Sequence, residues 1–140
     1  MIDYSDVEDV IERCFEELQT ATLSKYDTEK ADRTAALFLA AQIKLSFFIE
    51  DIEFKAKNAK NDISRIEGEK YFEYKSTNSD KKITENMLAS YISKESDIVE
   101  ARKECAIQEA TLKKYMYVMS VLKESHIYFR NLSKAKVWSE

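Results

Sequence analysis

Apolar residues recur at every third or fourth position along most of this chain, with polar residues between them. This spacing predicts amphipathic α-helices, because residues three and four apart share one face of a helix. The first helix is expected over about 5–22, with Ser5 and Glu8 in the arrangement of a capping box at its start. Its apolar face consists of Val7, Val10, Ile11, Cys14, Phe15 and Leu18.

The longest regular pattern predicts a helix over about 30–75. Its apolar and small residues alternate steps of four and three, a heptad spacing that favours coiled-coil-like packing when it is kept over several repeats. The seam expected from this spacing is Phe38, Gln42, Leu45, Ile49, Ile52, Ala56, Ala59, Ile63 and Ile66.

A polar stretch rich in turn-forming residues, 76–82, predicts a loop after this helix. Thr84 is expected to cap a short helix over about 84–94, and a last long helix is expected over about 97–137. The seam of that last helix is expected at Ile98, Ala101, Cys105, Leu112, Tyr115, Met119, Leu122 and Phe129.

These elements together predict an all-α fold in a single helical domain, 1–140. A short polar connection between two long helices favours an antiparallel arrangement. We therefore expect a long antiparallel helical hairpin with coiled-coil-like seams, a short N-terminal helix and a short helix after the hairpin loop. So thin a hairpin buries little surface per residue, and its seams are expected to be completed by other copies in a homo-oligomer.

Proline is absent and Gly68 is the only glycine, which fits long helices because both residues interrupt them. The same scarcity excludes glycine-rich phosphate-binding loops, and the sequence has no catalytic or metal-ligand motif. The one histidine, His126, falls on the seam of the last helix, where a packed histidine is the simpler interpretation. We expect a protein that binds and is not an enzyme, with no cofactor and no metal.

The start of the chain, MIDYSDVEDV, is acidic and lacks the apolar core of a signal peptide. No apolar run approaches the roughly 18 residues of a membrane span. Cys14 and Cys105 are isolated thiols without CxxC or histidine spacing, which fits buried free cysteines in a reducing compartment. We expect a cytoplasmic protein with no membrane partner.

Opposite charges collect towards the two ends of the chain, although the net charge is only −4. Residues 1–20 hold seven acids and one arginine, a local charge of −6, and residues 101–138 hold eight basic and three acidic residues, a local charge of +5. Such ends can pair within the chain, pair between subunits, or leave the basic end for a polyanion. Charge alone does not choose among the three.

Basic and aromatic residues are interleaved in Glu69–Lys75, just before the predicted loop. Single-stranded nucleic acid is held by cations on its phosphates and by aromatic rings on which its bases stack. The alternative is that Tyr71 and Tyr74 continue the heptad seam as core. The candidate nucleic-acid-binding residues are Arg65, Lys70, Tyr71, Tyr74, Lys75, Lys81 and Lys82, with Phe72 bracing the same surface.

A second basic-aromatic stretch near the end of the chain contains Arg130, Lys134 and Lys136. These cations are placed to contact phosphates. They equally suit the C-terminus of a helix, whose dipole favours positive charge, and this is the simpler interpretation.

The layout resembles the UvsY-type phage recombination mediator proteins over roughly residues 40–137. A long helix ends in a basic-aromatic stretch, and after a polar loop and a Thr-Glu restart the run Ser-Asp-Ile-Val opens the last helix. The family's motif, a Lys-x-Arg followed closely by a Tyr pair, lies over Gly68, Lys70 and Tyr74. Glycine stands at the first basic position of this motif, and Arg65 is the nearest substitute.

The resemblance implies a protein of the host cytoplasm that binds single-stranded DNA as rings of identical subunits. It also implies that the protein helps load a RecA-like recombinase onto strands coated by a single-strand-binding protein. The expected partners are therefore further copies of the chain, single-stranded DNA and these two proteins. The alternative is a structural or adaptor coiled-coil protein without nucleic-acid binding, whose uneven charges set register and partner choice.

Overall fold

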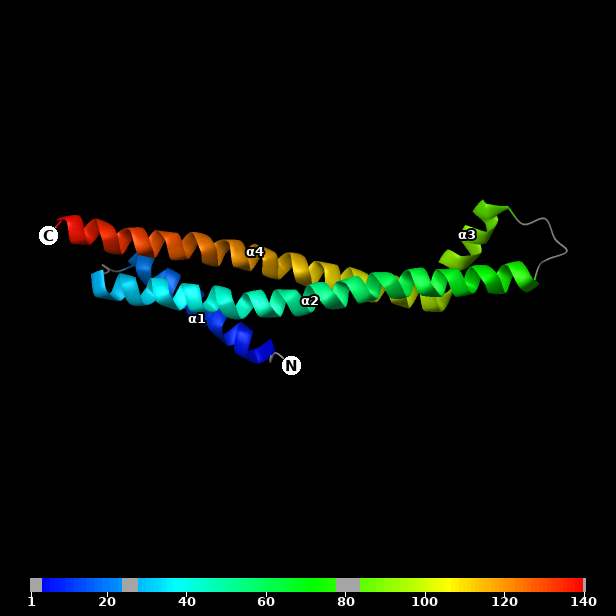
Figure 1. The fold of residues 1–140 in the computed structure, drawn as a ribbon, viewed down its shortest axis with the longest axis horizontal. Coiled ribbons are helices and arrows are strands. Elements are labelled where there is room, and N and C mark those ends of the chain that lie inside the picture. Colours follow the sequence, from blue (N-terminus) through cyan, green and yellow to red (C-terminus); the bar gives the residue numbers. More distant parts are fainter. Residues whose placement is uncertain (1–3, 24–27, 78–83, 140) are drawn as a thin grey trace. The chain divides into compact units, whose positions relative to one another are not determined.

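The computed structural model describes residues 4–23, 28–77 and 84–139 of the chain. Over these residues it consists of four helices and has no strand (Figure 1). The all-α prediction is confirmed, and two long helices form the arms of a helical hairpin, with one shorter helix before them and one between them. The helices are α1 (Tyr4–Leu23), α2 (Thr28–Thr77), α3 (Glu85–Ser93) and α4 (Ser96–Ser139).

The chain comprises two compact units, and both long helices contribute to each of them. The first unit consists of Met1–Asp51 and Lys113–Glu140, and the second of Ile52–Leu112. The first unit therefore contains α1 with the early part of α2 and the late part of α4. The second contains the rest of α2 and α4 together with α3.

Aromatic packing between α2 and α4 organises the first unit. The ring of Phe38 stacks on that of Phe129 with centroids 5.4 Å apart, and Phe48 meets Tyr115 edge-on at 4.8 Å. Contacts that advance along α2 thus move backwards along α4, so the two helices are antiparallel. The short helix α1 also belongs to this unit, and its residues Val7, Ile11 and Cys14 are buried there.

Polar contacts hold α1 against both long helices of the first unit. The hydroxyl of Tyr115 on α4 donates a hydrogen bond to the carboxylate of Glu8. On the α2 side, Lys44 Nζ lies 3.2 Å from Asp6 Oδ2. Burial also raises the pKa of the Cys14 thiol, to about 11, so the thiol is protonated at neutral pH.

The buried seam of α2 differs from the predicted one by one residue at two places. Ala41 and Phe48 are buried, whereas the expected Gln42 and Ile49 are only half-buried. The steps of three and four are preserved, but a neighbour one residue away points about 100° around the helix. Because α1 packs on the same unit, burial extends over the wider apolar stripe rather than over a two-helix seam alone.

Polar residues on the seam of α4 are satisfied by hydrogen bonds. His126 Nδ1 lies 2.9 Å from the backbone oxygen of Ala35, as expected for a packed histidine. Ser125 donates to the oxygen of Val121 at 2.7 Å, and Ser133 donates to the carboxylate of Asp32. These contacts allow polar side chains to be buried without the cost of an unpaired polar group.

A small apolar cluster organises the second unit. Leu88 and Ile92 of α3 and Ile98 of α4 are buried together, and Ile66, Tyr71 and Tyr74 of α2 pack against them. The N-cap of α3 is Thr84, as predicted, because its side chain accepts a hydrogen bond from the backbone N–H of Met87 at 3.2 Å. The cluster therefore ties the short helix to both long ones.

The observed helix ends correct two expectations. Ser5 was expected outside the first helix as its cap, but α1 already begins at Tyr4. The loop was expected from Ser76, but α2 continues through Thr77, and the rest of that predicted loop lies outside the described residues.

Two adjacent phenylalanines of α2, one buried and one exposed, test the observed register. Phe48 is fully buried against Tyr115, so Phe48→Ala should lower the free energy of unfolding by about 3–5 kcal/mol. The matched control, Phe47→Ala, removes a side chain that is 59% exposed and should change it by no more than about 0.5 kcal/mol. Urea unfolding followed by circular dichroism measures both, and equal losses would contradict the register.

Candidate nucleic-acid interface

The predicted basic-aromatic segment is helical and belongs to the second unit. Lys70, Tyr71 and Tyr74 are half-buried on the side of α2 that packs against α3 and the start of α4. Arg65 and Lys75 are exposed. The structure thus brings most of the predicted residues onto one stretch of α2. Lys81 and Lys82 lie outside the described residues.

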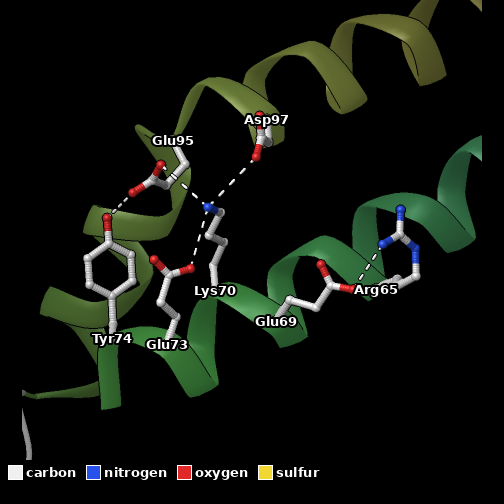
Figure 2. A network of polar contacts seen from close by, with 7 residues as sticks. All are labelled: Arg65, Glu69, Lys70, Glu73, Tyr74, Glu95 and Asp97. Atoms are coloured by element: carbon white, nitrogen blue, oxygen red, sulfur yellow. Dashed lines mark hydrogen bonds and ion pairs between the residues drawn. The ribbon is translucent and has the colours of Figure 1, made fainter. Parts of the chain in front are cut away.

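Lys70 lies among three carboxylates (Figure 2). Its Nζ is 3.5 Å from Glu73, 3.7 Å from Asp97 and 3.9 Å from Glu95, and only 19% of its side chain is exposed. The pKa of Lys70 is raised, chiefly by Glu73 and further by Glu95 and Asp97, against an opposing effect of desolvation. This ammonium group is neutralised within the chain.

Tyr74 completes the same network from the next turn of α2. Its hydroxyl donates to the carboxylate of Glu95 (Figure 2). Its ring stacks on that of Tyr91 with centroids 6.0 Å apart. The hydrogen bond to Glu95, with desolvation, raises the pKa of Tyr74. Both the ring and the hydroxyl are therefore engaged inside the second unit.

Tyr71 and Lys75 form a pair beside this network. The hydroxyl of Tyr71 donates to Glu85 at 3.2 Å and accepts from Lys75 Nζ at 2.8 Å. The hydrogen bond from Lys75 raises the pKa of that lysine. This leaves Tyr71 anchored at its hydroxyl and packed at its ring.

Arg65 lies on the exposed side of α2 and is held by its own helix. Its guanidinium is 2.9 Å from Glu69 and 3.9 Å from Asp62. Gly68, which occupies the first basic position of the family motif, is helical, and a Cβ atom added there would meet nothing within 4 Å. Each described cation of the predicted site thus already has a partner, and a phosphate would have to compete with it.

A second basic-aromatic surface lies on α4 in the first unit. Four cations on it are exposed, and none of the four has an ion pair among the described residues. The rings that lie between them in the sequence are accessible, since Tyr117 is 73% exposed and Tyr128 is 56% exposed. We call this surface the α4 basic face: Lys113, Tyr117, Lys123, Tyr128, Arg130 and Lys134.

The position of the α4 basic face follows from the seam. It lies on the side of α4 turned away from the buried Tyr115, Val118 and Leu122. One acid, Glu124, lies among its residues in the sequence. The phosphate-contact interpretation of Arg130 and Lys134 identified its end, but Lys113, Tyr117 and Lys123 were missed, and nothing is described of the side chain of Lys136.

The signal that identifies the missed residues is their offset from the seam. Once the seam residues of α4 are known, positions on the opposite side of the helix must face solvent. Basic and aromatic residues repeated at those positions cannot be explained by packing. In the second unit the same residue types fall on the packed side, where burial explains them.

Comparison with models of known protein families, with curated proteins and with solved structures gave no match. None of the described helices is long and apolar enough to cross a membrane. The described residues also contain no group of three histidines, cysteines or carboxylates placed to hold a metal ion.

The network around Lys70 predicts a salt- and pH-dependent contribution to stability. Lys70→Met should lower the urea midpoint, and high salt should shrink this difference because ions screen partly exposed pairs. The folded pKa of Lys70 is raised, so its contribution is fully present below the unfolded pKa of about 10.4 and is lost as pH rises through the folded value.

The control is Lys57→Met, which removes an exposed lysine of the same helix that has no ion pair among the described residues. Urea unfolding near neutral pH and at strongly alkaline pH measures both variants. A difference between Lys70→Met and the unchanged protein that persists undiminished at alkaline pH would contradict the electrostatic origin.

Proposed function

We propose that this protein binds single-stranded DNA as a homo-oligomer and acts, without catalysis, as a phage-type recombination mediator or accessory protein. The observation that supports strand binding best is the α4 basic face, where exposed cations with no ion pair among the described residues alternate along the sequence with exposed tyrosines. Its role in loading a RecA-like recombinase is supported only by the resemblance to the UvsY-type proteins.

The chemistry of the α4 basic face suits a strand of any sequence. Lysine and arginine contact phosphates, and tyrosine rings provide stacking surfaces that accept every base. Lys113 and Lys134 are 21 residues apart on one helix, a length of about 32 Å at 1.5 Å per residue. A surface of this length contacts several consecutive nucleotides, so no single contact needs to be strong.

The network around Lys70 has a different part in this proposal. Its carboxylates link α2 to Glu95, which follows α3, and to Asp97 at the start of α4, and they already pair with Lys70. The second unit is then a stable framework, and the strand is bound by the first unit. This division differs from the site expected from the sequence, in which Lys70 and Lys75 contact the strand directly.

A structural or adaptor role is the second candidate, and one observation favours it. Leu39, Ile43 and Phe47 are exposed on α2 in the first unit at spacings of four residues. Such a stripe is typical of a helix that packs against another helix, and contiguous exposed apolar surface marks interaction sites. In that role the stripe would assemble copies or capture a partner, and the α4 basic face would bind no strand.

Strand binding is tested by fluorescence anisotropy with a labelled oligo-dT of about 40 nucleotides, a length that spans several sites of this size. Binding should weaken steeply with salt, because each neutralised phosphate adds about −0.7 to the log–log slope on single strands. Lys113→Glu/Lys123→Glu/Arg130→Glu should therefore flatten the slope by about 2 and weaken binding strongly at low salt.

A charge-matched control separates the site from net charge. Lys57→Glu/Lys60→Glu/Lys103→Glu makes the same charge change at exposed lysines of the second unit and should bind nearly as the unchanged protein does. If Lys70→Glu/Lys75→Glu/Lys81→Glu abolished binding and the α4 variant did not, the strand site would lie in the second unit. A folded protein that bound no oligo-dT at low salt would favour the adaptor role.

A further inference from the structure

Three cations of the α4 basic face form a narrow stripe of their own. Lys123, Arg130 and Lys134 are separated by seven and four residues, which places them on one side of the helix. Ile127 lies within the stripe and is 49% exposed. This part of the face therefore combines an apolar residue with three cations that have no ion pair within the described part of the chain, as a surface that packs against another helix does.

A shorter acidic stripe lies on α1 of the same unit. Asp9, Glu12 and Glu16 are exposed and separated by three and four residues, and their carboxylates have no ion pair among the described residues. By contrast, Asp6 forms an ion pair with Lys44, and Glu8 accepts a hydrogen bond from the hydroxyl of Tyr115. The buried side of α1 holds this stripe on the surface of the first unit.

The two stripes are opposite in charge, and two positions of each have the same spacing. Asp9 and Glu16 are seven residues apart, as are Lys123 and Arg130, and seven residues of helix span about 10.5 Å. Within the fold the stripes do not pair with each other. One copy therefore presents both an acidic and a basic helix surface, each of which fits the opposite surface of another copy.

We propose that the acidic stripe of α1 in one copy docks on the Lys123, Arg130 and Lys134 stripe of α4 in a second copy, and that single-stranded DNA displaces it. The displacement rests on the proposed function, whereas the docking does not. Because each copy contributes two different surfaces, the contact is head-to-tail and can propagate from copy to copy.

The expected strength follows from where these charges lie. Exposed ion pairs contribute little one by one, so the contact should be weak, reversible and sensitive to salt. Ile127, and Phe15 at the edge of the acidic stripe, add apolar contact. A nucleic-acid strand carries a denser row of negative charge than α1 does. It should therefore displace α1 from the basic stripe of α4.

Reciprocal charge reversal tests the docking. The α1 variant is Asp9→Lys/Glu12→Lys/Glu16→Lys, and the α4 variant is Lys123→Glu/Arg130→Glu/Lys134→Glu. At about 0.01 M salt, where the Debye length is about 30 Å, light scattering should show salt-sensitive association of the unchanged protein and its loss in each variant alone. Mixing the two variants should restore it, because each then meets its complement.

A control variant with the same change in net charge tests whether that change alone alters the association. Glu50→Lys/Glu53→Lys/Glu100→Lys reverses three exposed acids outside α1 and should leave the association intact. Association that persists in the α1 variant, or a mixture that fails to recover it from folded variants, would overturn the docking.

The competition is tested separately with oligo-dT. If the stripe is covered in nine copies out of ten, the apparent dissociation constant is raised about tenfold. The α1 variant should therefore bind oligo-dT about tenfold more tightly than the unchanged protein, and the charge-matched control should gain clearly less. Equal gains in both variants would overturn the competition.

The two proposals fail in different ways. The α1 variant keeps the whole α4 basic face, so a complete absence of oligo-dT binding in that variant would contradict the proposed function. Recovery of association in the mixed variants involves no nucleic acid and would still support the docking.

Discussion

Burial of one face of α4 against α2 is the constraint on which the rest of the first unit depends. Phe129 and Tyr115 insert their rings beside Phe38 and Phe48, and this fixes the rotation of α4 about its own axis. Once that rotation is fixed, the residues on the side of α4 opposite the seam must face solvent. The α4 basic face is the outward consequence of this inward packing.

Lys70, Tyr71 and Tyr74 of the predicted site are packed in the second unit, whereas the α4 basic face is exposed in the first, because the two sets lie on different sides of their helices. In the second unit, Lys70 and Tyr74 fall on the packed side of α2, where Glu95 and Asp97 meet them. In the first unit, residues of the same types fall on the open side of α4. Composition alone therefore does not identify a nucleic-acid site, because the direction of each side chain decides whether its charge is already used.

Local patterns predicted the helices and the cap of α3, because these depend on residues close together in the sequence. The spacing of three and four residues defines both long helices, and Thr84 provides the cap where it was expected. The register of α2 was harder to predict, because Phe48 and Ile49 are adjacent and both apolar, so either could occupy the seam. Only the packing of α1 and α4 decides which of them is central.

The partners of Lys70 could not be predicted in this way. Glu95 and Asp97 reach it because the chain folds back through α3, and no local pattern encodes that return. The α4 basic face is the opposite case, since its residues stand in a regular offset from an identifiable seam. Only its end, at Arg130 and Lys134, was predicted, because its other residues are scattered along the sequence and only the direction of their side chains places them on the open side of α4.

The uneven distribution of charge along the chain has a different physical consequence in each unit. In the second unit, acids and bases meet within the unit, as Lys70 with Glu95 and Arg102 with Glu67 do. In the first unit, most acids of α1 and the outward cations of α4 remain apart. Charges that pair inside a fold contribute to its stability, whereas charges kept apart act on other molecules. The first unit is therefore where electrostatic recognition by this protein should be sought.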